Sequence, residues 1–184
     1  MLSIQINDKC GPMLRGEFYR EPLEKFFKKN GLGEVTGGGT LLNNNGQPAY
    51  CELELVLKDE SEEVVNEVKK KIDTIVPKGS TLYFENDQEI PVGNLEGVAI
   101  NLNFAKAPEE LLDNTDFQEM WENIEEAVGT HGVSHDDREG KDVFTLYYYG
   151  LDAEKIIHIV NETLSDKDIG KYIEPVKLPF VIEE

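Results

Sequence analysis

Apolar and polar residues along the chain follow two periods, which predict strands and helices in a repeated order. Alternation with a period of two at 51–57 and at 98–104 predicts strands with one buried face. Apolar residues at helical spacing predict four amphipathic helices, at 22–30, 61–75, 117–128 and 153–164. Shorter apolar or turn-bounded segments predict the other strands, at 2–6, within or beside the glycine triplet of 37–39, and at 81–85, 130–135, 142–149 and 171–178.

This order of elements predicts an α+β fold with an internal duplication. Each half of the chain follows the order β-α-β-β-α-β, so we expect two tandem ferredoxin-like repeats, each an antiparallel sheet with helices on one face. The predicted halves are residues 1–88 and 95–184, and a linker at 87–96 contains Pro91 and Gly93. A single domain with one continuous eight-stranded sheet and four helices behind it is the alternative.

The charge of the chain limits its partners. It holds 18 basic and 37 acidic residues, a formal net charge of −19. Cutting the chain after Gln88 leaves 11 basic and 15 acidic residues in the first part, net −4, and 7 and 22 in the second, net −15. Phosphate backbones and anionic membranes repel such a surface, so we expect no nucleic-acid and no membrane partner. With no apolar segment long enough to cross a bilayer and no signal segment at its start, the chain is predicted to be cytoplasmic.

The glycine triplet of 37–39 invites comparison with a phosphate-binding loop. Such a loop precedes a helix that begins with Lys and Ser or Thr, whereas this triplet is followed by a strand and by the hairpin sequence Asn43-Asn44-Asn45-Gly46. Repeated glycine within a strand is typical of a bulge or of a close approach by another backbone. We therefore expect a neighbouring backbone, from the other half or from a partner, to lie against Gly37, Gly38 and Gly39.

Few residues are candidates for a metal site or for catalysis. The densest group of ligand-type side chains is His131, His135, Asp136 and Asp137, but residues four apart in a strand are about 13 Å apart. A turn beginning at Ser134 could still gather His135, Asp136 and Asp137, and a solvated hairpin tip is the competing interpretation. We expect no metal and no other cofactor.

The two cysteines give little support to an enzyme. Cys51 alternates with leucines and is predicted to be buried as a small apolar side chain, whereas Cys10 is predicted to be exposed. The two could pair, but free thiols of a reducing compartment are the commoner case. Neither a Gly-x-Ser-x-Gly elbow nor a Cys-x-x-Cys motif is present, so we lean against catalysis.

An acidic helix and a group of tyrosines are the candidate binding residues. Glu119, Glu122 and Glu126 share one exposed helical face, in a segment, 108–127, that has no basic residue. Tyr147 and Tyr149 share one side of a strand. The competing interpretation is that the glutamates form an ordinary solvated helix face and that the tyrosines are ordinary residues of a sheet.

In architecture and charge the chain resembles acidic bacterial immunity and nuclease-inhibitor proteins with ferredoxin-like cores. These include proteins that neutralise secreted toxins and the ferredoxin-like regulators of ribonuclease E, to which 123–150 is similar through a helix that ends near HGVSHDD and leads into a strand. The resemblance implies a non-enzymatic protein that docks on a basic protein partner. The alternatives are a small-molecule sensor or enzyme that uses the cleft between the two halves, and a homodimer formed through open sheet faces.

Overall fold

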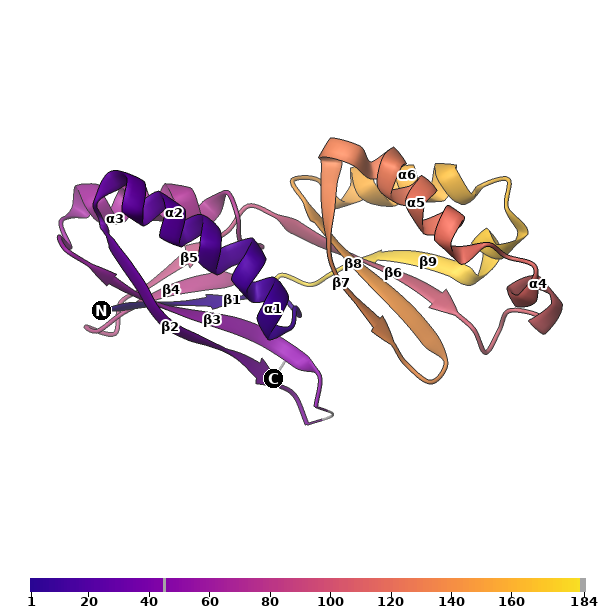
Figure 1. Cartoon of the computed structure of the whole chain (residues 1–184), viewed down its shortest axis with the longest axis horizontal. Helices are drawn as coiled ribbons and strands as arrows, with labels where there is room; N and C mark the ends of the chain where they lie inside the picture. The colour runs from indigo at the N-terminus through magenta and orange to yellow at the C-terminus, as the bar shows by residue number, and fades with distance from the viewer. Residues whose placement is uncertain (45, 183–184) are drawn as a thin grey trace. The chain divides into compact units, whose positions relative to one another are not determined.

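The computed structural model describes residues 1–44 and 46–182, and it divides the chain into two compact units (Figure 1). The first unit contains Met1–Leu95 together with the C-terminal segment from Pro179, and the second unit is Glu96–Leu178. The chain thus leaves the first unit after Leu95 and returns to it at Pro179. The boundaries expected from the sequence, 1–88 and 95–184, differ at both places, because neither 89–95 nor the returning segment carries a long periodic pattern.

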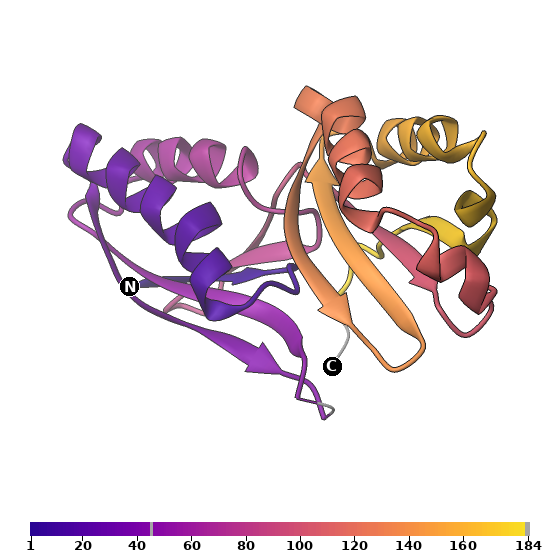
Figure 2. The same cartoon turned by 45° about the vertical axis from the view of Figure 1, so that its right-hand side comes forward.

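The first unit is a five-stranded antiparallel sheet covered on one face by helices. Its strand order is β2-β3-β1-β4-β5. Helices α2 and α3 lie over the same face (Figure 1, Figure 2). The strands are β1 (Leu2–Ile6), β2 (Gly33–Leu42), β3 (Pro48–Leu57), β4 (Ser80–Phe84) and β5 (Glu89–Val92), and the helices are α1 (Pro12–Arg15), the π-helical turn η1 (Gly16–Arg20), α2 (Glu21–Asn30) and α3 (Glu62–Asp73). With β1 between β3 and β4, the first four strands and the two helical connections form the predicted β-α-β-β-α-β unit.

Periodic apolar residues build the core of this unit. Alternate residues of β3 from Cys51 to Leu57 are buried, and they face the residues that the helices bury at intervals of four, Tyr19, Leu23 and Phe27 on one and Val68 and Ile72 on the other. Helix α2 ends at Gly31, whose φ of +68° is the left-handed conformation favoured after a helix. The alternate residues of the strand and the apolar residues of the helices therefore form one layer of side chains between the sheet and the helices.

The predicted linker is wrong, because its middle is the edge strand β5. Ser80 pairs with Val92 and Leu82 with Ile90, and these bonds attach β5 to β4. Proline is tolerated in an edge strand, since its missing N–H is not needed by a second neighbour, so Pro91 does not break the sheet. Four residues with alternating exposure are too few to give a clear sequence period.

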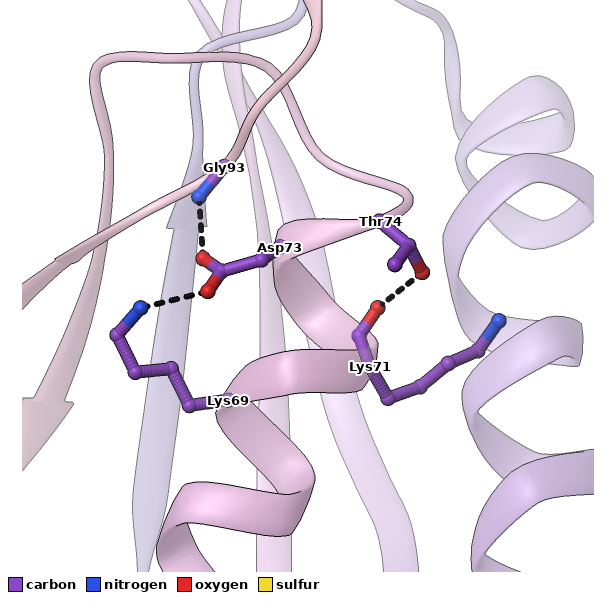
Figure 3. Close-up of polar contacts among 5 residues, drawn as sticks. All are labelled: Lys69, Lys71, Asp73, Thr74 and Gly93. Carbon is purple, nitrogen blue, oxygen red and sulfur yellow. Dashed lines mark hydrogen bonds and ion pairs between the residues drawn. The ribbon is translucent and has the colours of Figure 1, made fainter.

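A carboxylate at the end of α3 fixes the loop that follows β5 (Figure 3). The Asp73 carboxylate accepts a hydrogen bond from the backbone N–H of Gly93 at 2.9 Å and pairs with the Lys69 ammonium at 2.6 Å. In the same view the Thr74 hydroxyl donates to the carbonyl of Lys71 at 2.7 Å, which satisfies a helix-end carbonyl. Gly93 has a φ of +100°, and a Cβ there would clash with the carbonyl of Pro77.

The second unit repeats the topology in a four-stranded antiparallel sheet. Its strand order, β7-β8-β6-β9, matches β2-β3-β1-β4 of the first unit, and α5 and α6 cover one face (Figure 1). The strands are β6 (Glu96–Asn103), β7 (Gly132–Glu139), β8 (Val143–Gly150) and β9 (Ile173–Lys177), and the helices are α4 (Glu109–Asp113), α5 (Phe117–Val128), η2 (Gly129–His131), α6 (Ala153–Leu164) and η3 (Asp168–Tyr172).

The two sheets are separate, and the duplicated ferredoxin-like α+β fold is confirmed. Within the described residues, hydrogen-bonded strands fall into one sheet of five and one of four, so the alternative of a continuous eight-stranded sheet is wrong. Each unit has its own apolar core. No helix among the described residues has the length and apolar character that a membrane crossing requires.

Candidate functional site

Carboxylates cover the exposed side of α4 and α5 in the second unit. We call this set the acidic surface and define it by seven exposed residues, Glu109, Glu110, Asp113, Glu119, Glu122, Glu125 and Glu126. The second unit as a whole holds 7 basic and 19 acidic residues, a net charge of −12. The acidic surface therefore lies in a unit whose overall field is negative.

The core of the second unit fixes which side of α5 faces solvent. Met120, Ile124 and Val128 are buried at intervals of four residues. Asp116 caps the helix, since its carboxylate accepts a hydrogen bond from the backbone N–H of Glu119 at 3.0 Å. With the apolar side anchored, the helical period leaves Glu119 and the glutamates that follow it exposed.

The carboxylates of the acidic surface have no basic partners. None of the seven forms an ion pair with any residue in the described parts of the chain. The helices of the first unit differ, since Arg20 pairs with Glu24 at 2.7 Å and Lys25 with Glu21 at 3.2 Å. In α5, Glu122 instead has like charges three or four positions away, each costing a few tenths of a kcal/mol of helix stability, roughly 0.2–0.5. The last turn of α5 also lacks a basic residue to complement the helix dipole.

A hollow of about 300 Å³ lies beside the acidic surface, between α5 and η3. Three carboxylates line it, those of Asp116, Glu119 and Asp168, together with one basic side chain, Lys167. Apolar lining comes from Leu111, Met120 and Ile169. A hollow with apolar walls and a carboxylate rim suits a Lys or Arg side chain, whose methylene stem packs on apolar surface while its charged head meets the carboxylates.

Tyr148 connects α5 to the sheet. Its ring is 3% exposed and belongs to the core between the sheet and the helices. Burial, and to a lesser extent the nearby Glu125 carboxylate, raise the pKa of Tyr148 to about 12. A carboxylate of α5 therefore acts on a buried hydroxyl of the sheet.

Tyr147 and Tyr149 do not join the acidic surface. They flank Tyr148 in β8, so they point to the sheet face opposite α5 and α6. Tyr149 is 3% exposed, and Tyr147 is half-buried with the Arg138 guanidinium 5.1 Å from its ring centre. The structure thus separates the two groups that the sequence suggested as partner-binding residues.

His135, Asp136 and Asp137 do not converge on a common point. The turn expected after Ser134 is absent, because β7 continues to Glu139 and forms a bulge between Ser134 and Asp136. Asp136 pairs with Tyr147 and Asp137 with Leu146, so the two carboxylates point to opposite faces of the sheet. His135 is buried, with its ring centre 4.6 Å from that of Tyr149. Among residues 1–44 and 46–182, no three His, Cys, Asp or Glu side chains are placed to hold a metal ion.

The glycine triplet lies in β2, where the sheet is bulged between Val35 and Gly37. A Cβ on Gly37 would meet the Glu54 carboxylate, and one on Gly38 would clash with the carbonyl of Glu52, whereas Gly39 has open space around it. The close backbone is thus the neighbouring strand β3 of the same unit. In the hairpin that follows, Asn45 lies outside the described residues, and Gly46 donates its N–H to the carbonyl of Asn43 at 2.9 Å.

The two cysteines lie together in the core of the first unit. Cys10 is 0% exposed, so the prediction that it is exposed is wrong, and its sulfur lies 3.4 Å from that of Cys51. The buried carboxylate of Asp8 accepts a hydrogen bond from the Tyr19 hydroxyl in the same region. Because a ferredoxin-like unit places its first strand beside its third, Ile6 pairs with Cys51. The predicted topology therefore contained a signal that Cys10, four residues beyond Ile6, ends near Cys51.

Two larger hollows lie within single units. One of about 500 Å³ in the first unit is lined by Leu41, Leu42, Tyr50 and Ile182, among others. One of about 510 Å³ in the second unit has polar lining that includes Lys106 and Lys171. Both differ from the acidic surface in chemistry, since one mixes apolar with uncharged polar side chains and the other carries two ammonium groups.

The strand order and helix placement make the chain a duplicated ferredoxin-like α+β protein. No protein-family model and no curated protein matches its sequence. Solved structures similar to it include the regulatory subunit of aspartate kinase from Thermus thermophilus, with 12% identity, 88% of this chain and 91% of that chain covered, and a TM-score of 0.26. A proposed monooxygenase from Lactobacillus acidophilus has 9% identity, coverages of 96% and 90%, and a TM-score of 0.32. Another, from Fusobacterium nucleatum, has 16% identity, coverages of 99% and 92%, and a TM-score of 0.27.

Proposed function

We propose that this chain is a non-enzymatic acidic binding protein that docks on a basic protein partner, in the manner of an inhibitor or immunity protein. The observation that carries the proposal is the acidic surface, whose seven carboxylates have no ion pair in the described parts of the chain. Uncompensated like charges on one helix cost stability, so a function that uses them explains their presence better than folding does.

The hollow beside α5 gives the proposed interface an anchor. A Lys or Arg side chain of the partner would rest its stem on Met120 and Ile169 and bring its charge to the carboxylates of Asp116 and Glu119. The surrounding glutamates would steer the partner toward this point, since complementary charge acts mainly on association rate and partner choice. Binding of this kind weakens as salt is added.

The proposal includes a cytoplasmic location and no nucleic-acid, membrane or cofactor partner. Two cysteines in a chain of this length are typical of a reducing compartment, and the net charge of −19 supports the exclusion of anionic partners. The likeness of charge and topology to acidic immunity and nuclease-inhibitor proteins supports the inhibitor role. Tyr147 belongs to a different face, where a homodimer contact is the alternative use.

The proposal is tested by neutralising three carboxylates of α5. A variant with Glu119→Gln, Glu122→Gln and Glu126→Gln should lose the proteins that the immobilised wild type captures from lysate and releases at moderate salt. The matched control, Glu17→Gln, Glu34→Gln and Glu89→Gln, removes the same charge from exposed positions of the first unit and should retain them. The α5 variant should also gain about 0.5–1 kcal/mol of stability from relieved repulsion, so misfolding would not explain the loss.

Two results would count against the proposal. Equal capture by the α5 variant and by the control would show that the acidic surface does not select the partner. A small molecule that co-purifies at one-to-one ratio with the wild type, seen by native mass spectrometry, would favour a sensor or enzyme instead.

A further inference from the structure

The only two cysteines of the chain are in contact inside the first unit. Cys51 lies in β3, hydrogen-bonded to strands on both sides, and Cys10 lies in the loop 7–11 that joins β1 to α1. Their sulfurs are 3.4 Å apart, and both side chains are 0% exposed. A disulfide bond needs about 2.05 Å between the sulfurs, so closure requires a movement of only about 1.4 Å.

We propose that Cys10 and Cys51 are a redox-active dithiol that closes to an intramolecular disulfide when the protein meets a low-molecular-weight disulfide as oxidant. The movement, and the opening that lets the oxidant reach two sulfurs that are 0% exposed, would fall on the loop that carries Cys10, because a loop yields more easily than a central strand. This inference is independent of the proposed docking function, since it concerns the first unit and none of the acidic surface.

The polar groups around the pair differ at its two ends. The Arg15 guanidinium donates to the Thr40 hydroxyl at 3.3 Å, and that hydroxyl lies 3.8 Å from the Cys51 sulfur. At the other end, the hydrogen bond with Cys51, burial and the Asp8 carboxylate together raise the pKa of the Cys10 thiol. Either sulfur can make the first attack on the oxidant, and the other cysteine is then the resolving thiol.

The reaction balances in two exchange steps. One of the two cysteines loses its proton to solvent, and its thiolate attacks one sulfur of the oxidant; the oxidant's S–S bond breaks, and the reagent thiolate that leaves takes up a proton. The second cysteine then loses its proton and attacks the sulfur of the first; the second reagent thiolate leaves and takes up that proton. The net change is two protein thiols and one reagent disulfide converted into one protein disulfide and two reagent thiols.

Folding and the disulfide should stabilise each other. The bond would close a ring whose ends are 41 positions apart, which restricts the unfolded chain. By linkage, the folded state should favour the disulfide by the same factor, about 100-fold over the unfolded chain. A native geometry that strained the bond would reduce this factor to one or below.

The test compares oxidation equilibria of the full chain. The protein is equilibrated with reduced and oxidised glutathione at defined ratios, with and without concentrated urea, then acid-quenched, alkylated and weighed by mass spectrometry. We expect the folded protein to lose about 2 Da at an oxidant ratio about 100-fold lower than the urea-unfolded protein. Equal ratios, or a higher ratio for the folded protein, would overturn the proposal.

Variants and melting temperatures check the assignment. Cys10→Ala and Cys51→Ala should each abolish the loss of about 2 Da and leave at most a glutathione adduct, whereas Thr40→Val, which removes a neighbour but keeps both sulfurs, should retain the disulfide. The oxidised wild type should melt about 10 °C above the reduced form. An unchanged or lower melting temperature would contradict a disulfide that the native geometry accommodates, even if a cysteine variant failed to fold.

Discussion

At the residue scale, Gly38 and Gly39 are neighbours in β2 with opposite requirements. A side chain at Gly38, whose φ is +151°, would clash with the Glu52 carbonyl, whereas Gly39 has open space where a Cβ would lie. We expect Gly38→Val to destabilise the protein by about 2–3 kcal/mol and Gly39→Val to be close to neutral. Urea unfolding of the two variants measures the difference, and equal effects would mean that the triplet is simply a flexible segment.

Tyr148 makes the stability of the second unit depend on alkaline pH. Its pKa is raised from 10.0 to about 12 in the folded protein, so folding holds a proton that the unfolded chain releases. The stabilisation is complete below pH 10.0 and is lost as the pH rises through about 12, by at most about 3 kcal/mol. Chemical unfolding of wild type and Tyr148→Phe across this range isolates the effect. Parallel curves for the two proteins would contradict it.

Single residues were the least predictable part of the site. The alternation of Cys51 with leucines was enough to bury it, but Cys10 lies in the loop 7–11, where no period exists, so its burial became visible only in three dimensions. Likewise, Asp136 and Asp137 have the composition of a turn, and only their pairing with β8 shows that they extend a strand. The exposed face of α5 was predictable because its buried side has a regular period.

At the element scale, the connection between α3 and β5 depends on one carboxylate. Asp73 bonds the Gly93 N–H and the Lys69 ammonium, and its side chain is 18% exposed. We expect Asp73→Ala to cost about 1–3 kcal/mol, because a partly buried N–H and a charge lose their partner. The control Thr74→Ala, which removes an exposed bond to the Lys71 carbonyl, should cost less than about 1 kcal/mol.

Hydrogen exchange locates this effect. Faster exchange should appear in β5 and in the loop at Gly93 for the Asp73 variant, while α5 in the second unit should be unchanged. Uniform acceleration across the first unit would show that the carboxylate supports the whole core instead of this connection.

Helices and long strands followed from the sequence, and short ones did not. The four long helices were predicted because each turns a regular apolar side toward the core of its unit. Strand β5 was missed because it has four residues with Pro91 among them, and its place in the sheet is fixed by pairing with β4. A helix that packs on a core has a recognisable apolar period in the sequence, whereas the pairing of a four-residue strand with its neighbour produces no such pattern.

At the scale of the whole molecule, the segment after Leu178 belongs to the first unit. The Asn7 side chain donates to the Pro179 carbonyl at 3.2 Å, and the Lys78 ammonium lies 5.3 Å from the centre of the Phe180 ring. We expect a chain ending at Leu178 to lose about 1–2 kcal/mol of stability in the first unit only. Hydrogen exchange of β1 and β4 should report the loss, and Phe180→Ala should show a smaller part of it.

The second unit provides an internal control for this truncation. Trp121 is the only tryptophan and lies in α5, so its fluorescence reports the second unit alone. Its unfolding midpoint should not move. A shift equal to that of β1 and β4 would contradict the assignment of the C-terminal segment to the first unit.

The return of the chain at Pro179 has a consequence during synthesis. Gly97 and Leu178 are joined by a backbone hydrogen bond of 2.8 Å, so the second unit closes on itself between its two ends. The ribosome synthesises all of Glu96–Leu178 before Pro179, so the first unit lacks its final segment until the second unit has been synthesised. The second unit is thus free to fold to completion while the first is still unfinished, and the unit that is begun first is the one completed last.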